Sequence, residues 1–157
     1  MTRRRGFSIV ELLVVLTLMG VLVRLGMPRY SYLRRQAAAR AIVGDVQAVR
    51  VAAYNYNSEK NAWPTETTGG SPPPDLMAYL PAGFDFQRAE YSLDWEVWQT
   101  PGGIGANTAT SVVIGLAVES SDTLLVSALR SAARVGIPFM VTGARTTFLF
   151  AGFGGNY

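Results

Sequence analysis

The residues best placed to do chemistry lie where a charged stretch meets an apolar one. Three consecutive arginines, Arg3–Arg5, precede Gly6 and Phe7, and the apolar run that begins at Phe7 contains a carboxylate at Glu11. A small residue before an aromatic at this boundary is accessible to a protease on the cytoplasmic side of a membrane. Cleavage after Gly6 would leave a cationic α-amine on Phe7, one helical turn from Glu11. Because an unpaired carboxylate in an apolar segment is costly, Glu11 is a candidate partner for such an amine.

The apolar run continues from Phe7 to Val23 and, beyond Arg24, to Pro28. This length is enough for a membrane helix if the arginine side chain reaches the interface. Pro28 is expected to kink the helix without ending it, since prolines are tolerated in membrane helices. A conventional signal-peptide cut at residues 26–29 is disfavoured, because the proline and the arginines after it are a poor context. The run therefore predicts a membrane anchor.

The segment Gly6-Phe7-Ser8-Ile9-Val10-Glu11-Leu12, after its basic leader, resembles the precursor signature of type IV pilins and type II secretion pseudopilins. The resemblance implies that a prepilin peptidase, which is also an N-methyltransferase, cuts after Gly6 and methylates Phe7. It implies that Glu11 recognises a neighbouring subunit during assembly, and it matches the kink-forming proline of these helices to Pro28. Arg24 departs from the pattern, because family members usually keep that part of the helix uncharged.

The function that this resemblance implies is structural and not enzymatic. The chain would be a subunit of a type IV pilus or of a type II secretion pseudopilus, processed after Gly6 and polymerised through its N-terminal helix. Its precursor would cross the inner (cytoplasmic) membrane once, with the N-terminus in the cytoplasm, before entering a periplasmic pseudopilus or a cell-surface pilus. The implied partners are inner-membrane lipid, other pilin subunits, and the platform protein and ATPase of the assembly system.

The alternative function is that of a minor pilin whose head binds DNA, a surface or a secreted substrate. Residues 1–50 contain nine arginines against two acids, Glu11 and Asp45. Positive charge beside an apolar run favours contact with an anionic membrane surface, so DNA is the less favoured partner. The relative abundance of the chain in filaments would separate a major from a minor subunit.

The remainder of the chain predicts one globular head on a long helix. We divide the sequence into a leader at 1–6, a transmembrane or filament-core half-helix at 7–28, an amphipathic half-helix at 29–58 and a head at 59–157. The second half-helix is expected to end near Asn57 or Ser58. Its apolar positions recur at steps of three and four, which places them on one face: Ile42, Val46, Val49, Ala53 and Tyr56.

In the head, alternating and β-branched segments predict strands at 89–99 and 111–118, and a last strand over 139–142 and 146–150 with a turn or bulge at Gly143. A short helix is expected after a cap at Ser121 or Asp122, and a helical turn at 75–80 with Asp75 as its cap. The fold class is therefore α+β: a long N-terminal helix packed on a small antiparallel β-sheet head, like that of pilins.

We find no catalytic constellation in the head. The sequence has no Cys and no His, which excludes metal sites, nucleophiles and disulfides built from them. Asp94 and Glu96 could imitate a catalytic carboxylate pair, but acids that alternate with aromatics in a strand are usually its solvated side. The glycines at 102–105 lack the lysine of a phosphate-binding loop, and residues 152–157 lack acids for a C-terminal Ca²⁺ site. No metal, cofactor or enzymatic activity is expected.

Overall fold

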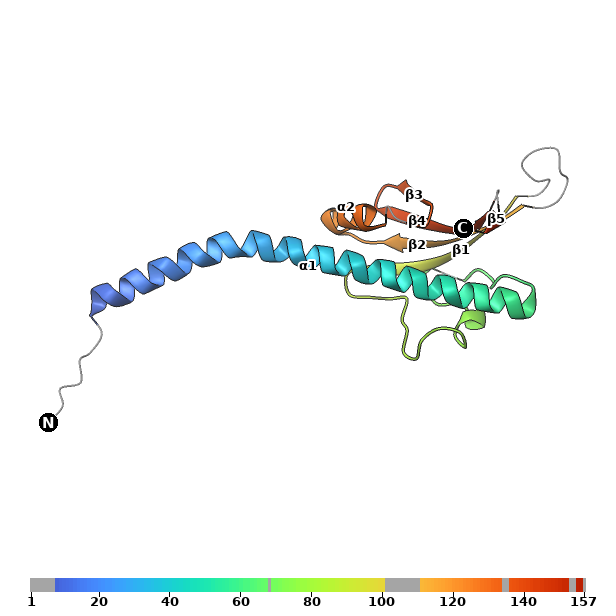
Figure 1. Cartoon of the computed structure of the whole chain (residues 1–157), viewed down its shortest axis with the longest axis horizontal. Helices are drawn as coiled ribbons and strands as arrows, with labels where there is room; N and C mark the ends of the chain where they lie inside the picture. Colours follow the sequence, from blue (N-terminus) through green and yellow to red (C-terminus); the bar gives the residue numbers. More distant parts are fainter. Residues whose placement is uncertain (1–7, 68, 101–110, 134–135, 153–154, 157) are drawn as a thin grey trace. The chain divides into compact units, whose positions relative to one another are not determined.

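The computed structural model describes residues 8–67, 69–100, 111–133, 136–152 and 155–156 (Figure 1). The chain divides into two compact units, residues 1–35 and 36–157. The described part of the first unit is helical from Ile9 on, whereas the second unit contains the rest of that helix together with the strands of the described residues.

Helix α1 spans Ile9–Lys60, 52 residues, and continues through Pro28. It ends two residues later than expected, at a backbone reversal where Asn61 has a φ of 51°. The amide of Asn61 still donates to the carbonyl of Asn57, at 2.8 Å. Asparagine is among the few residues that tolerate this left-handed conformation, so the chain leaves the helix there and not at the predicted Asn57 or Ser58.

The amphipathic face predicted for the second half of α1 is confirmed. Six residues of the helix are buried, all within the second unit: Ala39, Ile42, Val46, Val49, Ala52 and Ala53. Tyr56, one turn further on, is half-buried, and its ring meets that of Tyr79 edge-on at 5.7 Å. The buried residues of α1 belong to the same core cluster as the apolar residues of the sheet, and the second half of α1 runs along the sheet (Figure 1).

The sheet is antiparallel, with the strand order β1-β2-β4-β3 and a short β5 paired to β4. Its strands are β1 (Ser92–Thr100), β2 (Ser111–Glu119), β3 (Phe139–Thr142), β4 (Arg145–Gly152) and β5 (Gly155–Asn156). The two strands predicted at 89–99 and 111–118 are confirmed. The glycines at 102–105 lie outside the described residues.

Alternation along the strands produces the core. One face of the sheet is apolar and buried against α1, and it includes Leu93, Trp95, Ile114, Leu116, Phe148 and Phe150. Helix α2 (Thr123–Ala132) adds Leu125 and Leu129 to the same core. Asp122 caps α2, because its Oδ1 accepts hydrogen bonds from the amides of Leu124 at 2.9 Å and Leu125 at 3.2 Å. Of the two predicted caps, the structure therefore uses Asp122.

The final strand segment is a hairpin and not one strand. Strands β3 and β4 pair with each other, and Thr142 lies opposite Arg145 across the turn. Gly143 adopts a φ of 61° in that turn, a conformation that favours glycine. The turn, one of the two possibilities weighed for this position, is the one that forms.

The predicted helical turn at 75–80 is shorter than expected, and its cap is wrong. The structure has a 3₁₀-helix, η1 (Pro74–Leu76), with no side-chain cap. The carboxylate of Asp75 instead accepts hydrogen bonds from the amide of Thr65 at 3.3 Å and its hydroxyl at 3.1 Å. Asp75 therefore closes the loop that begins at Thr65, because this loop brings a donor pair to it from ten residues away.

Candidate functional site

The predicted cleavage site, Gly6 and Phe7, lies outside the described residues, and its role remains a prediction. The first described contact is the hydrogen bond from the amide of Leu12 to the carbonyl of Ser8, at 3.1 Å. Glu11 lies in the first turn of α1, and its side chain is exposed. A carboxylate is favoured at this end of a helix, because the N-terminal amides carry partial positive charge.

The first half of α1 is long and apolar enough to cross a membrane, and none of its apolar window is buried within the structure. Leu22 is 68% exposed and Leu25 is 71% exposed, values far above those of a core helix. The hydroxyl of Thr17 is satisfied inside the helix, because it donates to the carbonyl of Leu13 at 2.7 Å. This surface needs a lipid or protein environment, since exposed apolar patches of this size mark interaction sites.

The helix changes character after Met27. Pro28, Arg29 and Tyr32 lie next to one another, with the guanidinium of Arg29 6.0 Å from the centroid of the Tyr32 ring. The hydroxyl of Ser31 donates to the carbonyl of Pro28, at 2.9 Å. Tyrosine and arginine at the end of an apolar helix are typical of a membrane–water interface, where rings and cationic groups lie at the level of the lipid headgroups.

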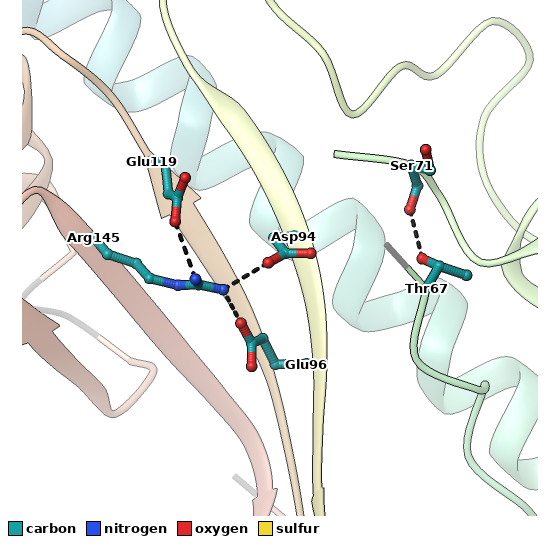
Figure 2. Close-up of polar contacts among 6 residues, drawn as sticks. All are labelled: Thr67, Ser71, Asp94, Glu96, Glu119 and Arg145. Atoms are coloured by element: carbon teal, nitrogen blue, oxygen red, sulfur yellow. Dashed lines mark hydrogen bonds and ion pairs between the residues drawn. The ribbon is translucent and has the colours of Figure 1, made fainter. Parts of the chain in front are cut away.

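A second polar cluster lies on the outer face of the sheet, opposite α1 (Figure 2). The guanidinium of Arg145, at the start of β4, binds Asp94 at 2.6 Å and Glu119 at 3.0 Å, and it also contacts Glu96. The two acids of β1 are 20% and 16% exposed, whereas Glu119 is 50% exposed. We refer to these four residues as the Arg145 cluster.

The Arg145 cluster corrects our expectation that Asp94 and Glu96 form a solvated strand face. They do alternate with buried residues, but an arginine from another strand covers them. The sequence does not reveal which strands are neighbours. In the structure β4 pairs with β2, and Arg145 lies directly opposite Glu119. The acids therefore serve a structural ion pair and not a catalytic pair, because an arginine occupies the space between them.

Asp45 links α1 to the segment before β1. Its carboxylate accepts a hydrogen bond from the hydroxyl of Tyr91 at 2.5 Å and lies 3.4 Å from the guanidinium of Arg88. Burial, and then the hydrogen bond to Asp45, raise the pKa of Tyr91, because both disfavour the phenolate. This contact gives Asp45 two partners from the head, although the second half of the helix is mainly basic.

Other acids of the head are dispersed. Asp85 accepts a hydrogen bond from the amide of Gln87 at 2.9 Å, which is a local turn contact. Within the part of the chain that the structure describes, no group of three or more His, Cys, Asp or Glu side chains is placed to hold a metal ion.

These features define a class of protein: a helix of membrane-spanning length whose second half is the central core element of an α+β head. The family model described as "Prokaryotic N-terminal methylation motif" matches residues 1–23. This match covers the basic leader, Gly6, Phe7, Glu11 and most of the apolar run. It therefore coincides with the segment whose chemistry first suggested processing.

The curated relatives match longer stretches of the chain than the family model does. The chain is 32% identical over 69 residues to "Type II secretion system core protein G" of Klebsiella pneumoniae, covering 44% of this chain and 49% of the relative. It is 28% identical over 88 residues to the protein of the same name from Klebsiella michiganensis, covering 52% and 62% of the two chains. The chain thus spans about half the length of the curated relatives it matches. No solved structure matches it.

The methylation motif and the distant similarity to these relatives make the chain similar to pilins and pseudopilins. The members of this family are structural proteins and not enzymes. The fold agrees with this similarity, because a long N-terminal helix packs its second half on an antiparallel sheet.

Proposed function

We propose that this chain is a structural subunit of a type II secretion pseudopilus or a type IV pilus, cut after Gly6 and polymerised through α1. The observation that carries the proposal is the apolar window of α1, which no other part of the described chain covers. Apolar surface of this extent is stable either in a bilayer or among other apolar helices. A filament built from parallel copies of α1 supplies the second environment.

Cleavage and methylation convert the membrane precursor into a subunit that can enter the filament. A prepilin peptidase removes the leader at 1–6 and methylates the amine of Phe7, which stays cationic. Glu11 follows Phe7 by four residues and lies in the first described turn of α1. In an apolar bundle, its carboxylate is stabilised when the amine of a neighbouring copy approaches it. This pairing selects partners that have been processed.

The proposed location follows from the same segment. The precursor crosses the inner membrane once, with its N-terminus in the cytoplasm, and the Arg29 and Tyr32 region lies at the opposite interface, in contact with lipid headgroups. The platform protein and ATPase of the assembly system then move it into the filament. The names of the two relatives favour a type II secretion system as the setting.

The test is mass spectrometry of filaments sheared from cells that express the full chain with its assembly system. We expect the chain to be present in the filaments and to begin at methylated Phe7. Cells that lack the prepilin peptidase are the control, and they should retain the uncut chain in the membrane. A mature form that still begins at Met1, or one trimmed near Arg29 and released as a monomer, would contradict the proposal. The proportion of the chain in the filaments distinguishes a shaft subunit from a minor one.

A further inference from the structure

Two ionisable side chains of opposite charge interrupt the apolar half of α1. Between Ile9 and Pro28 the sequence contains one acid, Glu11, and one base, Arg24. Both are exposed, and neither makes an ion pair with any residue that the structure describes. In an apolar surrounding each is costly alone, whereas together they can compensate each other.

The two side chains cannot meet within one copy of the helix. They are separated by thirteen residues, which corresponds to about 20 Å along the helix axis and about 140° around it. Side chains of one helix make contact at spacings of three or four residues. A pair between them therefore requires two copies.

The other acids of α1 already have partners. Asp45 accepts a hydrogen bond from Tyr91 and lies beside Arg88. Glu59 lies 2.7 Å from the ammonium of Lys60 and accepts a hydrogen bond from Tyr79 at 2.6 Å. Glu11 is thus the acid of this helix that is left for Arg24.

The surroundings of Arg24 suit the close approach of another helix. Gly20 lies four residues before it on the same face, and a Cβ added there would meet nothing within 4 Å. Thr17, seven residues before it, has its hydroxyl turned back onto the helix. Small residues on one face let two helix backbones approach in apolar surroundings. The carbonyl of Arg24 also lacks its usual helical donor, because Pro28 has no amide hydrogen. Arg24 therefore presents two polar groups, its guanidinium and its backbone carbonyl.

We propose that Arg24 of one copy binds Glu11 of a second copy, in parallel helices shifted by about 20 Å along their axes. The proposal rests on the filament function proposed above, and it specifies the axial shift between neighbouring α1 helices. A carboxylate has about four acceptor positions, so Glu11 can receive a guanidinium from one neighbour and the terminal amine from another. While the chain is in the bilayer, the long side chain of Arg24 reaches the headgroups, and the pair replaces that contact on assembly.

The test is a double-mutant cycle in the full chain, expressed with its assembly system. The variants are Arg24→Gln, Glu11→Gln and both together, with Arg40→Gln as a control that removes one exposed positive charge elsewhere on α1. The measurement is the amount of chain in sheared filaments divided by the amount of processed chain in the membrane. This ratio excludes variants that fail to insert or to be cut.

We expect Arg24→Gln to lower the ratio about tenfold or more, because it leaves a buried carboxylate short of its partner. Arg40→Gln should change it less than about twofold. The double variant should be no worse than Glu11→Gln alone, since removing both partners leaves neither charge unpaired.

If the filament losses of the two single variants multiply in the double variant, Arg24 and Glu11 act independently and the pairing is wrong. An equal loss in Arg40→Gln would also overturn the pairing, because it would indicate a general effect of charge. In both cases wild-type filaments beginning at Phe7 would still support the proposed function. If the wild type itself forms no such filaments, the proposed function fails and the register fails with it.

Discussion

Removal of Arg145 should destabilise the head more than removal of any single acid around it. The substitution Arg145→Met keeps much of the side chain's volume but deletes the guanidinium that binds Asp94, Glu96 and Glu119. Three carboxylates then remain on one face of the sheet with no cation between them. Like charges on neighbouring strands are destabilising.

The expected magnitude follows from how exposed these groups are. Breaking a fully buried ion pair costs about 3–5 kcal/mol, whereas an exposed pair contributes about 0–1 kcal/mol. Asp94 and Glu96 are 20% and 16% exposed, and the arginine is 32% exposed, so the case lies between these limits. We expect Arg145→Met to lower the free energy of unfolding by about 2–3 kcal/mol. Glu119, at 50% exposure, should contribute about 0.5 kcal/mol.

Urea denaturation of a soluble form beginning at Gln36, which retains the whole second unit, would measure these values. For a domain of this size, a loss of this magnitude lowers the urea midpoint by about 1–2 M. Glu119→Gln is the matched control and should shift it little. Adding Asp94→Asn and Glu96→Gln to Arg145→Met should recover part of the loss. If Arg145→Met is as stable as Glu119→Gln, the guanidinium does not organise this face and our reasoning is wrong.

Three further predictions address other contacts. Glu11→Ala should leave membrane insertion and leader cleavage intact but reduce incorporation into filaments; normal filament yield beside unchanged processing would contradict the pairing role. Thr146→Val should raise the unfolding free energy by about 1 kcal/mol in calorimetry, because the buried hydroxyl has no hydrogen-bond partner among the described residues; a loss instead would show that this hydroxyl is satisfied. Tyr91→Phe should lower stability by about 1–2 kcal/mol at neutral pH, since it removes the hydrogen bond to Asp45. The pKa of Tyr91 is raised in the folded state, so the stability that this tyrosine contributes is complete below the pKa of the unfolded chain, about 10, and is lost as the pH rises above that value. The difference in unfolding free energy between wild type and Tyr91→Phe should therefore narrow above about pH 10. A difference that stays constant with pH would refute this linkage.

The long helix and its buried face could be predicted from sequence because both depend on local periodicity. Ile42, Val46, Val49 and Ala53 recur at helical spacing, and all four are buried in the structure. Similarly, the alternation around Leu93 and Trp95 predicts a strand with one buried face. These patterns need no knowledge of which elements are neighbours.

The contacts that sequence reasoning missed join segments far apart in the chain. The Arg145 cluster forms because β4 lies beside β2 and β2 beside β1, an order that the strand patterns alone do not specify. Asp75 has the sequence context of a helix cap, yet the fold presents Thr65 to it. Strand β5 contains only Gly155 and Asn156, which is too short for any periodicity. The predicted cleavage site at Gly6 and Phe7 is the opposite case, since its prediction rests on a linear motif.

In the proposed filament, the exposed first half of α1 has a consequence for how readily a subunit moves between the membrane and the filament. Lipid tails and the side chains of neighbouring helices are similarly apolar, so a helix that moves from one surrounding to the other gains little from the hydrophobic effect. The balance between bilayer and fibre then depends on small differences in close fit and charge matching. Because the free-energy difference between bilayer and filament is small, a modest input of energy would be enough either to add subunits to the filament or to return them to the membrane.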